Sequence, residues 1–339
     1  MSFRVRPARN DDFQAIYEMA KLTGGGFTNL PPDRGALVDK LIRSEKSFAS
    51  QAAEPGDDLF LFVLENFATG QVRGTCQVFG MVGTEHAFYS YRITTLTQTS
   101  QALGKTFRAE MLSLTTDLEG ASEVGGLFLH PGERAGGLGL LLARSRYLFI
   151  KRHRHRFGRR VLAELRGVID EAGGSPFWDA IAGRFFGMNF QEADEFNASH
   201  GTQFIADLMP KTPIYTAMLP ETARSVMGIP HPSGRAAMRM LEHEGFSYDG
   251  YIDIFDGGPT MIAQTDQVRT VRASSEYVIA ETADEVEGQN MMLAAGQLGT
   301  FAASCSNMRV LEDGGAVITR AAADALGLRP GDSFTAIGR

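Results

Sequence analysis

A glycine-rich turn is the stretch of this chain whose residue types and spacing point most directly to chemistry. Arg134, Gly137 and Gly139 stand in the pattern Arg-x-x-Gly-x-Gly. An apolar run at 124–129 predicts a strand before the turn, and apolar periodicity over about 140–157 predicts a helix after it. Glycines let the backbone approach an oxygen closely, and the first amides of a helix point at an anion with the helix dipole behind them. The turn is therefore a predicted site for a phosphate-bearing ligand.

Spacing decides which phosphate ligand the turn fits. A nucleoside-triphosphate loop ends in Gly-Lys-Ser/Thr, whereas this turn ends in Gly139-Leu140-Leu141, which excludes that ligand. A dinucleotide loop needs a third glycine where Leu142 stands, and only Glu164, at the distance of a ribose contact, favours it. The pattern instead resembles the loop that binds the acyl-CoA pyrophosphate in the GNAT-type N-acyltransferases. The alternative, glycines that only ease a tight strand-to-helix turn, stays open.

Two of the seven histidines precede a proline and are candidates for proton transfer. His130 ends the predicted strand before the glycine turn, and His231 precedes a predicted helix that ends at Gly245. Histidine has an unperturbed pKa near 6.5, so it can donate or accept a proton at neutral pH. Position along the chain favours His130, because it lies beside the predicted anion site.

Two pairs of charged residues have spacings that suggest a structural use. Strand alternation over 159–168 places Glu164 and Arg166 on one face, where an internal ion pair is favoured over substrate binding. Asp253 and Asp256 are three residues apart, hence on opposite faces of a continuing strand, and are poor candidates for a carboxylate pair.

The elements that must position these residues mix strands with helices. Strands are predicted at 3–6, 59–65, 72–82, 89–96, 124–129, 159–168 and 251–255, and further helices near 11–20, 33–48 and 176–186, with one more within 229–246 that ends at Gly245. Three consecutive glycines, 24–26, separate the first two helices, where the loop is expected either to border an acceptor site or only to stop a helix.

Composition restricts the class of protein. The chain has 339 residues, 43% of them hydrophobic, which is enough for two domains with a core. A net charge of −7 disfavours nucleic acid or an anionic membrane as partner. Cys76 and Cys305 lie in no metal or redox spacing, the N-terminus has no signal-like apolar stretch, and no apolar run could span a bilayer. We therefore expect a cytoplasmic protein without a metal site.

With these motifs in view, the chain resembles the bacterial arginine N-succinyltransferases over roughly residues 3–272. The resemblance is carried in order by RPARNDDF, KLTGGGFTNLP, FLHP, ELRGVIDEAGGSPFW, RFFGMNF, FIADLMPKTPIY, HPSGRAAMRMLEHEGF and IDIFDGGPT. It implies an α+β fold of tandem GNAT-like mixed sheets flanked by helices. Residues 1–189 would be the acyl-CoA-binding domain, 190–271 a second, degenerate GNAT-like unit, and 272–339 a small β-rich C-terminal element.

The resemblance also implies substrates and roles. The donor would be succinyl-CoA, a co-substrate rather than a tightly bound cofactor, and the acceptor would be the α-amino group of L-arginine. The family's succinyl-CoA contact falls on Leu127, beside the loop residues Arg134, Gly137 and Gly139, and its catalytic histidine falls on His231. The family also hints at an oligomer.

Several alternatives remain at this point. The acceptor could be ornithine or another amine, or the chain could be a non-catalytic acyl-CoA-binding regulatory subunit. A guanidinium calls for a carboxylate partner, and the sequence cannot rank the candidates Glu164, Asp170, Glu171 and Asp253. The distal carboxylate of a succinyl group calls for a cation, for which Arg92 and Arg166 are conceivable.

Overall fold

A computed structural model of the chain describes residues 3–23, 29–134, 136–193, 196 and 203–339. Fifteen strands form one continuous sheet in the order β12-β15-β11-β14-β13-β1-β2-β3-β6-β7-β10-β9-β4-β5-β8. The strands are β1 (Phe3–Pro7), β2 (Leu59–Asn66), β3 (Gln71–Phe79), β4 (Ser90–Ser100), β5 (Lys105–Thr115), β6 (Ser122–Leu129), β7 (Arg160–Glu164), β8 (Ile214–Tyr215), β9 (Ser247–Asp253), β10 (Pro259–Gln264), β11 (Ser275–Ala283), β12 (Gln289–Ala295), β13 (Ala302–Val310), β14 (Ala316–Thr319) and β15 (Ser333–Gly338).

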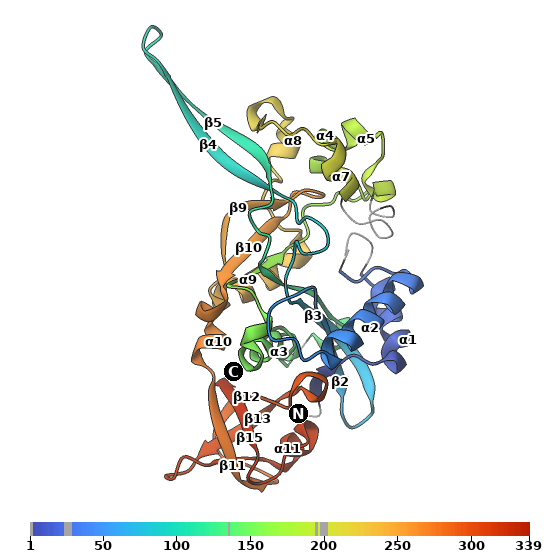
Figure 1. Ribbon diagram of the computed structural model, residues 1–339, viewed down its shortest axis with the longest axis vertical. Coiled ribbons are helices and arrows are strands. Elements are labelled where there is room, and N and C mark those ends of the chain that lie inside the picture. The colour runs from blue at the N-terminus through green and yellow to red at the C-terminus, as the bar shows by residue number, and fades with distance from the viewer. Residues whose placement is uncertain (1–2, 24–28, 135, 194–195, 197–202) are drawn as a thin grey trace.

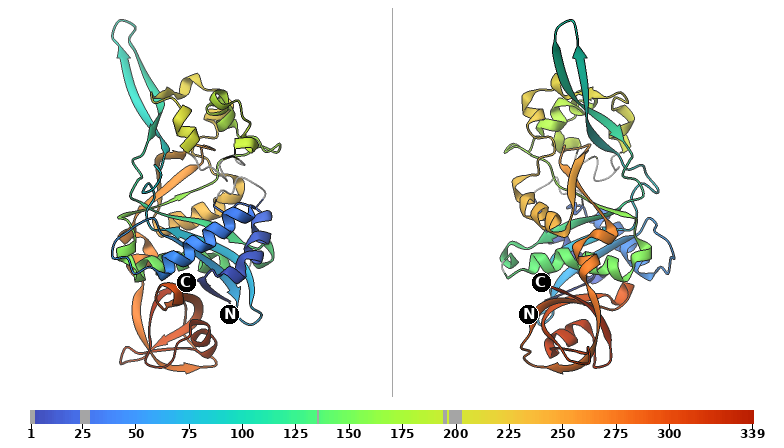
Figure 2. Two further views of the ribbon diagram at one scale, coloured as in Figure 1. Left: turned by 45° about the vertical axis from the view of Figure 1, so that its right-hand side comes forward. Right: turned by 90° about the vertical axis from the view of Figure 1, so that its left-hand side faces the viewer.

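Helices cover both faces of the middle of this sheet (Figures 1 and 2). On one face lie α1 (Phe13–Lys21) and α2 (Arg34–Ala49), which pack on Leu61, Val63 and Phe128. On the other face lies α3 (Leu138–Arg152), most of whose residues are buried in the largest apolar core. A helix that is buried almost all round, as α3 is, has its position fixed by packing on every side.

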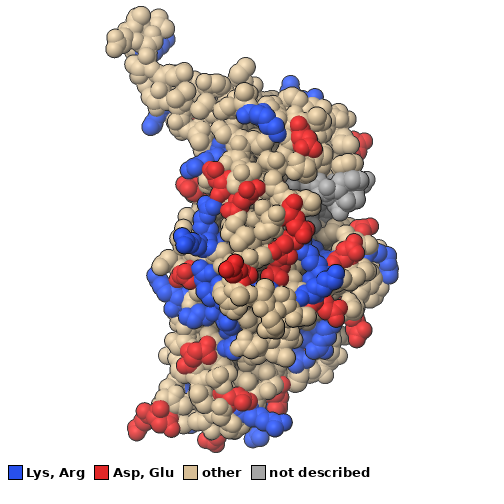
Figure 3. All heavy atoms as spheres, in the orientation of Figure 1, with Lys and Arg blue, Asp and Glu red and all other residues tan. Residues whose placement is uncertain are grey.

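Two segments project from the middle of the sheet. The long hairpin of β4 and β5 extends from the body as an arm with few charged side chains (Figures 1 and 3). Short helices gather beside the base of the arm around a separate core of Trp178, Phe177 and Phe255. They are α4 (Pro176–Ala180), α5 (Gly183–Phe186), α7 (Gln203–Leu208) and α8 (Glu221–Arg224).

The C-terminal strands form a small closed ring. The five strands are neighbours in the order β12-β15-β11-β14-β13, and an additional pairing of β12 with β13 closes the circle. The helix α11 (Arg320–Leu326) packs against these strands. Arg144 of α3 donates to the carbonyl of Gly338 at 2.9 Å, and its Nε lies 3.0 Å from Glu244. The bond to Gly338 of β15 joins the ring to α3, and the buried ion pair with Glu244 holds the Arg144 side chain in place.

The predicted α+β class is confirmed. The strands of residues 190–271 continue the sheet of the preceding residues, because β10 pairs with β7 and β9 pairs with both β10 and β4. The division at residues 189 and 271 stays a prediction. The helix after the glycine turn begins at Leu138 instead of Leu140, since Gly137 already adopts the left-handed conformation that starts it, with φ +78°.

Candidate functional site

The parallel strands β6 and β7 are paired only at their beginnings. Ser122 lies opposite Val161 and Glu123 opposite Leu162, and the register ends there although both strands continue. We call the unpaired continuation, 124–129 of β6 with 163–166 beside it, the strand fork. Backbone groups on the facing edges of a fork are available to a ligand, since no neighbouring strand takes them.

A bulge in β6 lies at this fork. Gly125 is opposite Gln77 of β3 and Phe128 is opposite Thr75, so β6 carries one extra residue between them. The extra residue is accommodated at Gly126, whose φ is +57° and whose carbonyl accepts a hydrogen bond from the Thr75 hydroxyl at 3.0 Å. A bulge re-aims the neighbouring backbone and is frequent next to active sites. The predicted contact residue Leu127 follows the bulge directly.

The glycine turn follows β6 at the same end of the sheet. Gly136 and Gly137 both have positive φ, Gly137 is the N-cap of α3, and Gly139 lies in the first turn of the helix. Arg134 bends back so that its Nε donates to the carbonyl of Leu129 at 3.4 Å. Strand, turn and helix start therefore occur in the predicted order, and the amides of the first turn of α3 face away from the helix body.

Sequence reasoning missed one cation at this turn. The guanidinium of Arg339, contributed by the C-terminal ring, donates to the carbonyl of Gly136. It lies so close to Gly137 that a Cβ on that residue would collide with it. No pattern near residue 134 could reveal this neighbour, because 203 residues separate Arg339 from Gly136.

The main chain of His231 is docked on the fork. Its N–H donates to the carbonyl of Arg166 at 2.7 Å. The amide of Leu165 donates to Pro259 of β10, so the backbone groups of Arg166 point to the other edge of β7, toward β6. Leu127 therefore lies on the β6 side of the fork and the main chain of His231 on the β7 side, although the two residues are far apart in the sequence.

The imidazole of His231 is held by Ser233. Its Nδ1 lies 2.7 Å from the hydroxyl of Ser233 and accepts the main-chain N–H of that residue at 3.2 Å. A hydroxyl donates to a neutral Nδ1 and can turn to accept from a protonated one. Burial and the positive charge of Arg166 lower the pKa of His231, so the ring is neutral at rest.

The other candidate, His130, occupies a turn of the same kind. Its Nδ1 accepts the N–H of Gly132 at 3.2 Å and lies 3.0 Å from Nη2 of Arg73. Neither of these groups can accept a hydrogen bond, so protonation of Nδ1 would break both contacts. The main-chain N–H of His130 bonds to Arg73, which continues the ladder between β6 and β3 and leads away from the fork.

The charged pairs differ from the prediction. The favoured ion pair is wrong: Glu164 and Arg166 form no salt bridge, and Oε1 of Glu164 and Nε of Arg166 are buried without a hydrogen-bond partner in the described structure. Asp253 and Asp256 do not lie apart either, because β9 ends at Asp253 and the chain turns, so that the amide of Asp256 donates to Oδ1 of Asp253 at 2.8 Å.

The remaining carboxylate and cation candidates are occupied or exposed. Asp170 accepts the amides of Ala172 and Gly174 within its own loop, and Glu171 is exposed. Arg92 lies 3.4 Å from Asp117 on the surface. Among the four carboxylates that the sequence left unranked, the half-buried Glu164 thus has a buried oxygen without a hydrogen-bond partner in the described structure.

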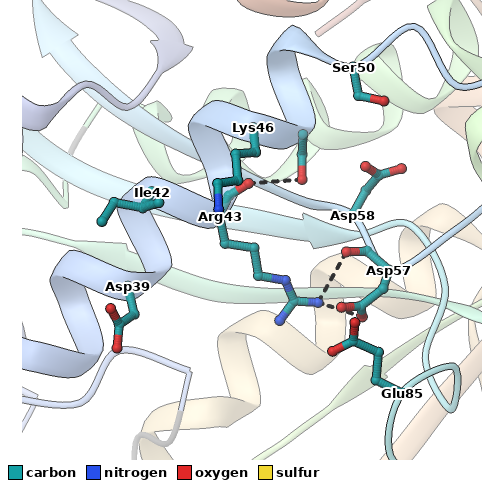
Figure 4. Close-up of a pocket in the computed structure, with 9 residues that line it drawn as sticks. Asp39, Ile42, Arg43, Lys46, Ser50, Asp57, Asp58 and Glu85 are labelled. Carbon is teal, nitrogen blue, oxygen red and sulfur yellow. Dashed lines mark hydrogen bonds and ion pairs between the residues drawn. The ribbon is translucent and has the colours of Figure 1, made fainter.

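Other features lie apart from the fork. A hollow on the outer side of α2 is lined by Arg43, Asp57 and Glu85, and Arg43 points at Asp57, 2.6 Å away (Figure 4). Its lining carries charges of both signs, and it contains none of the predicted site residues. In the described ranges, no cluster of His, Cys, Asp and Glu could hold a metal ion, and no helix is long and apolar enough to cross a membrane.

A forked parallel strand pair with a bulge, a glycine turn at a helix start and a histidine docked on the fork define an acyl-CoA-type acyltransferase on an α+β scaffold. Comparison with known proteins makes the class specific. The family "Arginine N-succinyltransferase beta subunit" matches residues 3–270, and the family of its C-terminal domain matches residues 267–338. The chain belongs to the arginine N-succinyltransferase family.

Individual members of the family are similar to this chain over most of their length. The "Arginine N-succinyltransferase subunit beta" of Pseudomonas aeruginosa is 44% identical over 276 residues, 81% of each chain. The arginine N-succinyltransferase of Citrobacter koseri is 42% identical over 285 residues, 84% of this chain and 81% of the relative. The solved structure of arginine/ornithine succinyltransferase subunit AI from Pseudomonas aeruginosa superimposes with a TM-score of 0.91 at 32% identity, covering 99% of this chain and 98% of that one.

Proposed function

We propose that this chain transfers the succinyl group of succinyl-CoA to the α-amino group of L-arginine, giving N2-succinyl-L-arginine and CoA, the first step of arginine degradation by the succinyltransferase route. The observation that carries the proposal is the family match along nearly the whole chain, together with a histidine docked on the strand fork. Buried, unbridged Cys76 and Cys305 support the cytoplasmic location that we propose with it.

In this proposal the fork and the glycine turn bind the donor. The diphosphate of CoA lies on the amides at the start of α3, from Gly136 to Gly139, with the guanidinium of Arg339 beside it. The pantetheine arm runs along the free edge of β6, and an amide near Leu127 faces the thioester oxygen. Arg166 is our candidate for the distal carboxylate of the succinyl group, because its Nε has no partner in the described structure whereas Arg92 is engaged by Asp117.

His231 manages the transferred proton in our mechanism. The ammonium of arginine first loses one proton to solvent, and the free amine attacks the thioester carbon, so that a C–N bond forms and the carbonyl electron pair moves to oxygen. For the next step the neutral ring carries its proton on Nδ1, which donates to the Ser233 hydroxyl in place of the contact with the Ser233 main-chain N–H. Nε2 of His231 then takes the second proton from nitrogen. The tetrahedral intermediate collapses, the C–S bond breaks with its electron pair on sulfur, and His231 passes its proton to that sulfur.

A release assay for free thiol tests the function. Succinyl-CoA with L-arginine should give CoA, and acetyl-CoA should be a poorer donor. L-ornithine is the second candidate acceptor, because the similar Pseudomonas structure is named for both amino acids. Binding of CoA without thiol release with any amine would contradict the proposal and favour a regulatory subunit.

We also propose that the chain works in an oligomer. Both Pseudomonas relatives are named as subunits, and the β4–β5 arm exposes Leu103 and Phe107 near its tip. Light scattering on the purified chain measures the assembly, and a monomer at all concentrations would contradict this part of the proposal.

A further inference from the structure

A row of polar side chains crosses the sheet beside the fork, on the face that α2 partly covers. Glu123 of β6 is opposite Leu162, two residues before Glu164 of β7. Glu164 is opposite Thr260 of β10. Because side chains alternate along a strand, Glu123, Glu164 and Thr260 point to the same face.

The row continues onto two further strands. The amide of Asp253 in β9 donates to the carbonyl of Gly258, two residues before Thr260, so Asp253 shares this face. Ser90 of β4 is directly opposite Asp253. Four adjacent strand contacts therefore place three carboxylates and two hydroxyls on one face of the sheet.

Three atoms of the row have no hydrogen-bond partner in the described part of the chain. They are Oε1 of Glu164, Oγ1 of Thr260 and Oγ of Ser90. Thr260 is fully buried and Ser90 is 1% exposed. A buried polar atom without a partner is costly, and native structures contain few of them. Glu164 and Thr260 are directly opposite each other, so their two unpaired atoms point to one missing group that donates several hydrogen bonds.

The electrostatics of the row indicate that the missing group is a cation. Burial, and then the charges of Asp253, Glu123 and Asp256, raise the pKa of Glu164 well above its usual range. Burial raises the pKa of Glu123 to about 7, against the opposing effects of Asn29 and Lys40. These four carboxylates repel one another in a buried place, and a bound cation would relieve the repulsion.

The nearby cations of the chain are not paired with Glu164. Nζ of Lys40 donates to the carbonyl of Asn29 and to the side chain of Gln77, at 2.6 and 3.0 Å. Arg166 keeps an Nε without a hydrogen-bond partner in the described structure and does not bond to Glu164. Among the described residues, no lysine or arginine forms a salt bridge with Glu164.

We propose that Glu164, assisted by Thr260 on the neighbouring strand, binds the guanidinium of the acceptor amino acid. The inference rests on the proposed function for the identity of the acceptor. A guanidinium is planar and offers five N–H donors in a fixed fork, which suits one carboxylate with a hydroxyl acceptor beside it. The side-chain ammonium of ornithine is a point charge with three donors on a shorter stem, so it would leave part of the row unsatisfied.

The position of Glu164 fits this use. Glu164 lies two residues before Arg166, whose carbonyl holds His231, and two strand residues span about 7 Å. That separation is similar to the length of an extended arginine side chain. An acceptor with its guanidinium on Glu164 can therefore present its α-amino group to the fork near His231.

The test is Glu164→Gln, which keeps the shape of the side chain and removes its charge. We expect the KM for L-arginine to rise about 10- to 100-fold, and the KM for succinyl-CoA to stay within about twofold of the parent. Glu171→Gln, an exposed carboxylate on the following loop, is the matched control and should change neither value. Thr260→Val, which removes only a buried hydroxyl, should raise the KM for L-arginine about three- to tenfold.

A titration of L-arginine followed by thermal unfolding separates this inference from the proposed function. Arginine should raise the Tm of the parent and of Glu171→Gln but not that of Glu164→Gln, because a ligand stabilises only the state that binds it. If the parent turns over L-arginine and Glu164→Gln has an unchanged KM, the inference is wrong while the function stands. If the parent releases no thiol, a rise in Tm with arginine that is lost in Glu164→Gln still supports the inference. An equal rise in both proteins, or no rise in the parent, overturns it.

Discussion

The two His-Pro turns of this protein are nearly identical locally and differ in what surrounds them. His130 has φ −52° and ψ 134°, and His231 has φ −50° and ψ 144°; each caps a short 3-10 turn by accepting the amide two residues on. The partner strand is different: His130 continues the β6–β3 ladder, whereas His231 docks on the free edge of β7. The same local motif is thus a structural cap in one place and a candidate proton carrier in the other.

The second difference is the chemistry at Nδ1. Ser233 gives His231 a hydroxyl that can donate or accept, whereas His130 has only the amide of Gly132 and the guanidinium of Arg73, which donate. A ring that must gain and lose a proton needs the first kind of neighbour. The comparison teaches that the residue two positions after the histidine carries more information about its role than the His-Pro pair itself.

The largest expected effect is that of His231→Ala. It should lower kcat roughly 10²- to 10⁴-fold, the range for loss of an acid–base group, with the fold unchanged. Steady-state thiol release together with circular dichroism measures both. If His231→Ala kept a kcat within threefold of the parent, His231 would not be the acid–base group, and the two His-Pro turns would not differ in function.

Ser233→Ala should make the neighbourhood of His231 resemble that of His130. Only the main-chain amide would remain at Nδ1, and loss of a hydrogen bond worth about 0.5–1.5 kcal/mol should lower kcat about 2- to 10-fold. Ser225→Ala, which removes a hydroxyl that bonds only to its own helix, is the control for a general effect of losing a serine. Equal rates in the two variants would contradict the role of the hydroxyl.

The pH profile should separate the two turns as well. The pKa of His231 is lowered by burial and by Arg166, so its neutral form, and with it kcat, should persist below pH 6.5 before activity falls on the acid side. Arg166→Gln removes a positive charge and should move this acid limb to higher pH, measured at saturating succinyl-CoA. Arg309→Gln, an exposed cation in the C-terminal ring, should leave the limb in place. A limb that does not move would mean that another group controls it.

The smallest effect on activity is expected for His130→Ala. It should leave kcat within about twofold and lower the free energy of unfolding by about 1 kcal/mol, because a cap and the contact with Arg73 are lost. Urea denaturation measures the stability. A loss of kcat comparable to that of His231→Ala would reverse the assignment of the two histidines.

Much of the local structure could be predicted from the sequence, because it is decided within a few residues. The apolar run before the glycine turn, the helix after it and the positive φ at Gly137 follow from periodicity and from the conformational freedom of glycine. Family motifs add the class of enzyme. The end of β9 was misjudged because a pattern of alternating residues does not show where the chain leaves the strand.

Only the tertiary structure decided which of these features meet. The order β6-β7-β10-β9-β4 brings Glu123, Glu164, Asp253 and Ser90 onto one face from positions as far apart as 90 and 253, and the ring brings Arg339 to Gly136. It also left Glu164 without the ion-pair partner that spacing along its own strand suggested. The physical reason is that register and strand order depend on packing between distant segments, whereas periodicity records only which face of its own element a residue occupies.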